Sequence, residues 1–247
     1  RELFGEIYEQ IPELPFCNIW TAMQLSSRLP KGALFHMGVS NTRRCWNMFQ
    51  LPESVESACN VGCCGIDGCV STLVGASLVN PDRLCYVVVG DLTFFYDLNS
   101  LGNHHIGTNL RVMLVNNGRG TEFRLGIHHC NVFGDDADKY MAAAGHFGNK
   151  SPLLVKHYAE DLGFHYLSAT TKEEFMTALS NFTNPQLSDH SMILEVFTDS
   201  KDESEALYLM SHIQSDAKGM VRSKLKDAVR NVAGEKGINA IKKILKK

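Results

Sequence analysis

Two short apolar runs, rich in β-branched residues, constrain the fold of this chain more than any other feature. They span Cys85–Val89 and Val112–Val115; the residues GDL follow the first run and NNG the second. Short apolar runs that end in this way are typical of buried parallel strands. Because ligands of open parallel sheets bind beyond the carboxyl ends of the strands, we expect Asp91 and Asn117 to emerge at the same edge, on neighbouring strands.

The side chains expected at that edge indicate a site for a cation and a phosphate. A carboxylate and an amide oxygen are hard ligands that suit Mg²⁺ or Ca²⁺ rather than a thiophilic metal. Two side chains do not form a complete cage, and Mg²⁺ normally fills its octahedron with water and substrate phosphates. Gly90 allows the backbone to approach a phosphate closely. We therefore expect a diphosphate-bearing cofactor held through Mg²⁺.

These motifs resemble the diphosphate-binding motif of thiamine diphosphate-dependent enzymes, in which Gly-Asp is followed about two dozen residues later by Asn-Asn. Here 24 residues separate Leu92 from Asn117. The third motif position is usually Gly, and the Leu92 variant within GDLTFFYDLNSL is most similar to the menaquinone-pathway family of 2-succinyl-5-enolpyruvyl-6-hydroxy-3-cyclohexene-1-carboxylate synthases. The segment GCCGIDGCVSTLVG extends the resemblance, which covers about residues 38–123 and continues more loosely to about residue 198.

The resemblance implies a role for each motif position. It assigns the metal to Asp91, Asn117 and the backbone carbonyl of Arg119. It assigns the cofactor, beyond those ligands, to a set of residues in the surrounding turns: Ser40, Asn41, Cys64, Ile66, Gly90 and Leu92. Among these, Ile66 corresponds to the aliphatic wedge that bends the cofactor and is the residue nearest to the chemistry, and the Cys64 carbonyl would accept a hydrogen bond from the aminopyrimidine. It assigns substrate contacts to Arg44 and Phe123.

Plainer interpretations of these residues stay open. Ser40 or Asn41 is also suited to capping a helix, Arg44 to a solvated position, and Ile66 to the first core position of the next helix. Two positions depart from the menaquinone-pathway pattern: Val61 stands in place of an Arg and Glu122 in place of a bulky apolar residue. The cofactor site is thus expected to be intact and the substrate site to be changed.

As an activity, the resemblance implies decarboxylation of a 2-oxo acid followed by protonation or carboligation. The activating glutamate of this family lies on a separate pyrimidine-binding domain, and the two domain types meet across subunits. Because 247 residues leave no room for that second domain, we expect a missing segment or a second chain to supply it, and we expect a homo-oligomer. Two alternatives stay open: a non-catalytic or regulatory thiamine diphosphate-binding protein of the same fold, and an unrelated nucleotide-binding α/β protein. The absence of a GxGxxG or GxxxxGK[ST] run after an expected strand weighs against the latter.

Composition limits the other classes of protein. A net charge of −3 argues against a general nucleic-acid partner. The sequence contains no apolar run of about 18 residues, so it predicts no membrane span. Its first residues do not have the pattern of a signal peptide. We therefore expect a cytoplasmic protein without a membrane partner. The eight cysteines include no CxxC pair, which favours small buried thiols over a zinc site. Because the sequence begins with Arg1, we expect part of a longer protein.

The alternation of apolar patterns predicts an α/β fold: a doubly wound parallel sheet with helices on both faces, as in the thiamine diphosphate-binding fold. We expect a connector over residues 1–17, the binding domain over 18–200 and a basic helical extension over 201–247, where 11 Lys and Arg stand against 6 Asp and Glu. The expected strands are Ala33–Met37, Ser57–Asn60, Cys85–Val89, Asn109–Val115, Phe164–Ser168 and Ser191–Phe197. The expected helices are Ile19–Leu29 with Asn18 as its cap, a short one from Asn41 toward Met48, Cys69–Leu78, Thr93–Gly102, Ala137–Gly145, Leu153–Leu162 and Lys172–Phe182, with two further amphipathic helices at Val221–Val232 and Ile238–Leu245.

Overall fold

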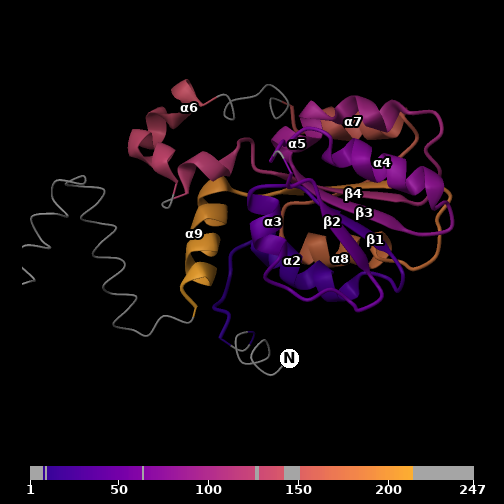
Figure 1. The fold of residues 1–247 in the computed structure, drawn as a ribbon, viewed down its shortest axis with the longest axis horizontal. Helices are drawn as coiled ribbons and strands as arrows, with labels where there is room; N and C mark the ends of the chain where they lie inside the picture. Colours follow the sequence, from indigo (N-terminus) through magenta and orange to yellow (C-terminus); the bar gives the residue numbers. More distant parts are fainter. Residues whose placement is uncertain (1–7, 9, 63, 126–127, 142–150, 214–247) are drawn as a thin grey trace, which may run out of the picture.

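A six-stranded, entirely parallel sheet forms the centre of the protein in the computed structural model (Figure 1). The structure describes residues 8, 10–62, 64–125, 128–141 and 151–213. The strands are β1 (Leu34–Met37), β2 (Glu56–Cys59), β3 (Cys85–Gly90), β4 (Leu110–Asn116), β5 (His165–Ala169) and β6 (Met192–Phe197). All six expected strands are therefore present, each within one residue of its predicted ends.

The order of the strands across the sheet is β2-β1-β3-β4-β6-β5. The chain runs outward from β1 to β2 and then returns to place β3 on the other side of β1. This reversal leaves a crevice between the loops that follow β1 and β3, which is where open α/β sheets bind ligands.

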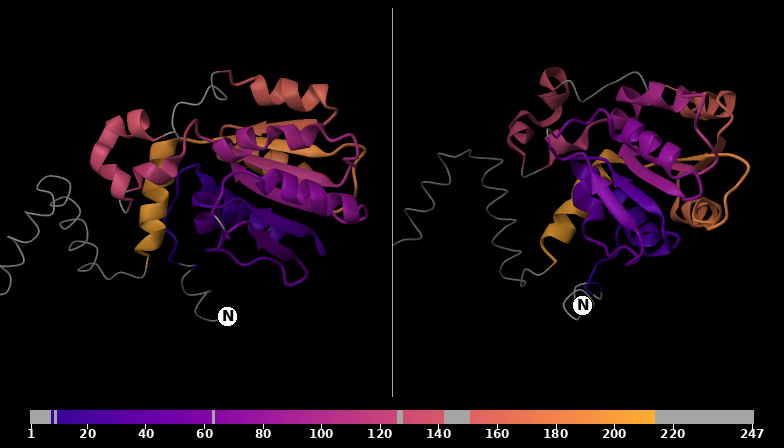
Figure 2. Two further views of the ribbon diagram at one scale, coloured as in Figure 1. Left: turned by 45° about the horizontal axis from the view of Figure 1, so that its top comes forward. Right: turned by 45° about the vertical axis from the view of Figure 1, so that its right-hand side comes forward.

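Helices cover both faces of the sheet, which confirms the predicted fold class (Figures 1 and 2). One face packs against α2 (Asn18–Leu25), α3 (Asn41–Trp46), α8 (Lys172–Phe182) and α9 (Ser200–Ser211). The other packs against α4 (Cys69–Val79), α5 (Asp91–Tyr96), the 3₁₀ turn η2 (Leu98–Gly102) and α7 (Leu154–Asp161). The remaining elements are η1 (Ser26–Arg28), η3 (Thr121–Arg124), η4 (His129–Asp136) and α6 (Ala137–Tyr140).

The alternation of side chains along β3 explains why both faces are covered. Tyr86 and Val88 enter the core beneath α2 and α8, whereas Val87 and Val89 enter the core beneath α4 and α5. All four are at most 1% exposed. A strand that is apolar at every position must be covered on both sides, since successive side chains point to opposite faces.

The predicted bounds of two helices, Thr93–Gly102 and Ile19–Leu29, need correction. The helix expected over Thr93–Gly102 begins earlier, at Asp91, and is divided at Asp97 into α5 and η2. The Asp97 carboxylate accepts the backbone N–H of Ser71 at 2.7 Å and so joins this break to the start of α4. The first helix ends at Leu25 and continues only as the turn η1.

The predicted cap of that first helix was wrong. Asn18 is the first residue of α2, and its side-chain carbonyl accepts the indole N–H of Trp46 at 2.9 Å instead of capping the helix. The cap comes from far along the chain: both oxygens of Glu203 accept the backbone N–H of Asn18.

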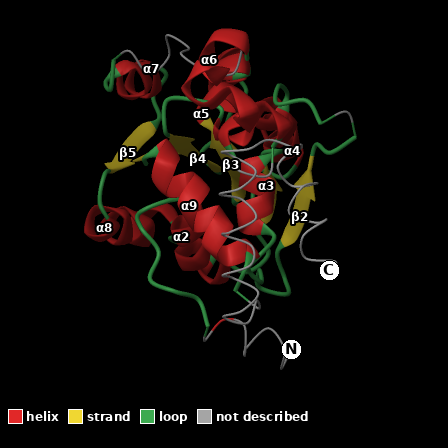
Figure 3. Cartoon of the chain, turned by 90° about the vertical axis from the view of Figure 1, so that its left-hand side faces the viewer, coloured by secondary structure: helices red, strands yellow, loops and turns green. Residues whose placement is uncertain are grey.

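The region after residue 200 contains one helix that the sequence reading did not assign. Asp199 caps α9, accepting the backbone N–H of Lys201 at 2.7 Å. The buried side of α9, which includes Ala206 and Leu207, packs on α2 and η3 beside the carboxyl end of the sheet (Figure 3). The helix expected to reach Gly145 ends earlier, at Tyr140, since Met141 has an extended backbone. The two helices expected at 221–245 lie outside the described residues.

Candidate functional site at the carboxyl edge of the sheet

A cavity of about 500 Å³ lies at the carboxyl edge of the sheet, at the reversal of strand order. The loops that follow β1, β3 and β4 form most of its wall, and the loop before α4 and the starts of α2 and α9 complete it. The lining residues include nearly every residue proposed from the sequence: Ser40, Asn41, Arg44, Cys64, Ile66, Gly90, Asp91, Leu92, Asn117 and Arg119. Phe123 lies in η3, directly after the lining residue Glu122, but its side chain is outside the described part of the structure.

The pairing of β3 with β4 brings the two proposed metal ligands together. Gly90 is opposite Val115 in the parallel register, so Asp91 and Asn117 follow the ends of adjacent strands and enter the same cavity. Asp91 is 2% exposed, and its Oδ1 accepts the backbone N–H of Leu92 at 2.8 Å. This bond fixes the carboxylate at the first turn of α5.

A local hydrogen bond orients Asn117. Its Oδ1 accepts the backbone N–H of Arg119 at 3.3 Å, across a turn in which Gly118 has φ of 80°. An amide oxygen has two lone pairs, so it is able to accept this bond and still bind a cation. The preceding Asn116 points elsewhere, since its Nδ2 donates to Glu195 at 2.7 Å inside the core. The two asparagines of the pair therefore have different environments.

The donor set fits a hard divalent cation bound to a diphosphate. It offers one carboxylate, one amide oxygen and a backbone carbonyl in the turn at Arg119, which are oxygen ligands of the kind Mg²⁺ takes. A Cβ built on Gly90 meets no atom within 4 Å, so open space lies directly beside the backbone at the end of β3. Among the described residues, no cluster of three or more His, Cys, Asp or Glu side chains is arranged to hold a metal, and the seven described cysteines are all free thiols.

The turn after β1 has an uncommon backbone. Ser40 has φ of 65°, a region that a residue other than Gly enters at a cost. Its hydroxyl makes no helix-capping bond but donates to Glu122 in η3. The side chain of Arg44 is 38% exposed, and its guanidinium pairs with the same Glu122 carboxylate. The side chain of Asn41 donates to Thr121 Oγ1 at 2.7 Å.

The loop before α4 places Cys64 and Ile66 on the cavity wall. Cys64 is exposed and has φ of 54°. Ile66 is half-buried and precedes the first residue of α4 by three positions, so it is not a core residue of that helix. The interpretation of Ile66 as the first helical core position was therefore wrong, and its side chain belongs to the cavity wall.

The sequence analysis did not identify two acids of the site, Glu122 and Glu203, as hydrogen-bonding partners of other residues. Glu122 was noted only as a departure from a family pattern, and Glu203 was not singled out. Glu203 lines the cavity, is 6% exposed, and accepts the hydroxyl of Thr198 at 2.6 Å. Burial raises its pKa to about 7 against the hydrogen bonds that favour its charged form. A signal was present: Glu203, Ala206, Leu207 and Met210 share one helical face, so the acid occupies a core position of an amphipathic pattern.

Comparison with known proteins supports the family resemblance. No family model matches the chain. A 2-succinyl-5-enolpyruvyl-6-hydroxy-3-cyclohexene-1-carboxylate synthase of Bacteroides fragilis is 34% identical over 196 residues, which are 79% of this chain and 34% of that protein. The synthases of Phocaeicola vulgatus and Christiangramia forsetii are 34% and 33% identical over 80% and 81% of the chain.

The chain spans about a third of the length of these relatives. The three relatives carry the same enzyme name. Over about four-fifths of its length, this chain is therefore homologous to part of the 2-succinyl-5-enolpyruvyl-6-hydroxy-3-cyclohexene-1-carboxylate synthases, the family that its motifs resemble.

Proposed function

We propose that this chain is the diphosphate- and Mg²⁺-binding domain of a thiamine diphosphate-dependent 2-oxo acid decarboxylase or carboligase. The observation that carries the proposal is the meeting of Asp91, Asn117 and the Arg119 turn in one cavity, beside the open space at Gly90. When bound, the cofactor supplies a carbon nucleophile that adds to the carbonyl of a 2-oxo acid and stabilises the charge left by decarboxylation.

The chain's own residues hold and orient the cofactor in this proposal. Asp91, Asn117 and the Arg119 carbonyl would hold Mg²⁺, an ion that usually completes its coordination with phosphate oxygens and water. The backbone at Gly90 and Leu92 and the turn at Ser40 and Asn41 would line the diphosphate end of the site.

Two residues of the loop before α4 act on the organic part of the cofactor. Ile66, on the cavity wall, would support the cofactor in a bent shape. The backbone carbonyl of Cys64 would accept a hydrogen bond from the aminopyrimidine. Both roles concern shape, and neither requires an ionisable side chain in this chain.

The proposal includes a partner. A pyrimidine-binding domain on a further segment or a second chain supplies the activating glutamate, and the sites form between subunits of a homo-oligomer. Turnover of a 2-oxo acid by this chain alone, without an added partner, would contradict this part. A second turnover assay, with the partner domain added, tests the alternative of a regulatory thiamine diphosphate-binding protein. That alternative predicts no turnover even with the partner domain present.

Equilibrium dialysis of thiamine diphosphate with Asp91→Ala tests the cofactor site. We expect the variant to lose Mg²⁺-dependent binding, since it removes the one carboxylate among the three proposed protein ligands. Asp161→Asn is a matched control, because it removes an acid from α7, which contributes nothing to this cavity. Retained binding in Asp91→Ala, or equal loss in the control, would refute the assignment. A nucleotide-binding protein would bind a nucleotide in the absence of Asp91.

None of the helices in the described residues is both long and apolar enough to span a membrane. The cytoplasmic location stays a prediction.

A further inference from the structure

The ion pair between Arg44 and Glu122 changes the charge of the cavity. Arg44 lies on α3 and Glu122 on η3, which follow different strands of the sheet. The guanidinium Nη1 of Arg44 and the hydroxyl of Ser40 both donate to Oε2 of Glu122. The two charged side chains are 38% and 21% exposed, so the pair faces the cavity and is only partly screened by water.

Glu122 is held in this position by a second contact beside it. Asn41 donates to Thr121, the neighbour of Glu122, and also accepts from Arg44 Nη1 at 3.2 Å. The carboxylate therefore does not depend on one flexible contact. Its position is fixed by two links between the turn after β1 and η3.

The ionisable residues of the cavity wall balance in number. The cations are Arg43, Arg44 and Arg119, and the acids are Asp91, Glu122 and Glu203. Asp91 is committed to the proposed metal, and Glu203 caps α2. Glu122 is thus the acid that offsets Arg44.

We propose that Glu122 determines the specificity of this cavity by neutralising Arg44, so that the end of the cavity beside α3 takes an uncharged group and disfavours a carboxylate. An anionic ligand at Arg44 has to displace Glu122 or lie close to it, and like charges in a partly buried site repel. The substrate class is then one whose far end carries no second carboxylate. This inference extends the proposed function to the substrate end of the cavity.

Titration of succinate, a simple dicarboxylate, into the 247-residue chain tests the inference by calorimetry in the absence of thiamine diphosphate and Mg²⁺. Four proteins are compared: the unchanged chain, Glu122→Gln, Arg44→Gln and the double variant. Glu122→Gln keeps the hydrogen-bonding shape but removes the charge. We expect it to bind succinate about tenfold more tightly than the unchanged chain, and we expect no gain in Arg44→Gln or in the double variant.

Glu160→Gln is the matched control, since it removes one exposed acid of α7 that pairs with Lys156 at 3.9 Å and is not on the cavity wall. Circular dichroism and thermal melts confirm that each variant is folded, and Glu122→Ala serves in place of Glu122→Gln if the latter does not fold. Equal affinity in the unchanged chain and Glu122→Gln, a gain of the same size in the double variant, or no binding by any variant would overturn the inference.

The result is independent of the cofactor proposal because no cofactor is present. A failure of Mg²⁺-dependent cofactor binding with a retained gain in Glu122→Gln would remove the proposed function and leave the inference standing. Normal Mg²⁺-dependent cofactor binding, without a gain in succinate affinity in Glu122→Gln, would leave the proposed function standing and overturn the inference.

Discussion

Glu203 and Asn18, which are 185 residues apart, are joined by two hydrogen bonds: each oxygen of the Glu203 carboxylate accepts the backbone N–H of Asn18, at 2.9 and 3.0 Å. This contact satisfies an N–H group at the start of α2 that no residue within the helix is able to satisfy. It also fixes α9 against the domain beside the cavity. The end of the domain and its first helix therefore depend on one buried carboxyl group.

The buried position of Glu203 predicts a pH-dependent stability. Its pKa is raised from 4.5 to about 7, chiefly by burial, with Asp202 and Asp199 adding to the shift. The folded state binds a proton on Glu203 more tightly than the unfolded state does. The resulting contribution of Glu203 to the free energy of unfolding is therefore fully present below about pH 4.5. It is lost as pH rises through about 7, and amounts to up to about 3 kcal/mol.

Urea unfolding at a series of pH values, compared between the unchanged chain and Glu203→Gln, measures this effect. The difference in unfolding free energy between the two proteins is expected to change between pH 4.5 and 7 and to be constant outside that window. A difference that is constant from pH 4 to 8, to within about 0.5 kcal/mol, would show that the carboxyl group does not titrate in this range.

A second buried acid supports the Asn-Asn pair. Glu195, which is 1% exposed, accepts Asn116 Nδ2 and the hydroxyl of Tyr166, both at 2.7 Å. Glu195→Ala leaves two polar groups without an acceptor in the core and is expected to cost about 3 kcal/mol of stability. Tyr166→Phe removes one partner and is expected to cost about 1 kcal/mol. Chemical denaturation measures both, and equal costs would mean that Asn116 does not need its acceptor.

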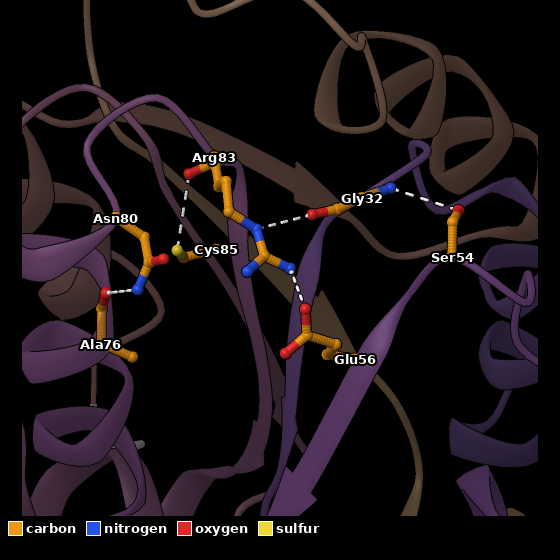
Figure 4. Close-up of polar contacts among 7 residues, drawn as sticks. All are labelled: Gly32, Ser54, Glu56, Ala76, Asn80, Arg83 and Cys85. Atoms are coloured by element: carbon orange, nitrogen blue, oxygen red, sulfur yellow. Dashed lines mark hydrogen bonds and ion pairs between the residues drawn. The ribbon is translucent and has the colours of Figure 1, made fainter.

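Arg83 makes partly exposed contacts at the amino ends of the strands, opposite the carboxyl ends where the cavity lies (Figure 4). Arg83 Nε donates to the carbonyl of Gly32 at 2.9 Å, and its Nη2 pairs with Glu56 at 2.9 Å. These bonds tie together the segments that start β1, β2 and β3. Arg83→Met is expected to lower the unfolding free energy by about 1 kcal/mol, mainly through the bond to the backbone.

Glu56→Gln separates the two contributions of Arg83. The Glu56 side chain is 72% exposed, so its ion pair is screened by water and its loss is expected to cost no more than about 0.5 kcal/mol. A cost for Glu56→Gln equal to that for Arg83→Met would place the stabilisation in the ion pair instead of the backbone contact.

The sheet and the positions of Asp91 and Asn117 were predictable because they depend on local patterns. Buried strands such as β3 and β4 are apolar at every position, and polar residues mark where they end. The rule that ligands bind beyond the carboxyl ends of parallel strands then placed Asp91 beside Asn117. These two positions are set by strand order, which requires no knowledge of side-chain contacts.

The roles of Glu203 and Glu122 were not predictable in the same way. Each acid is paired with a group 78 or more residues away, and a Glu on a short amphipathic helix is ordinarily solvated. The division of the helix at Asp97 has a similar cause, since the Asp97 carboxylate is committed to the N–H of Ser71. Contacts between distant segments decided these positions.

Calorimetric titration of thiamine diphosphate into this chain, with Mg²⁺ and then with EDTA, tests the central claim most directly. We predict binding that requires Mg²⁺, because Asp91, Asn117 and the Arg119 carbonyl contact the diphosphate through the cation. Binding of equal strength in EDTA, or no binding in either condition, would contradict the claim that this chain carries the metal and diphosphate site.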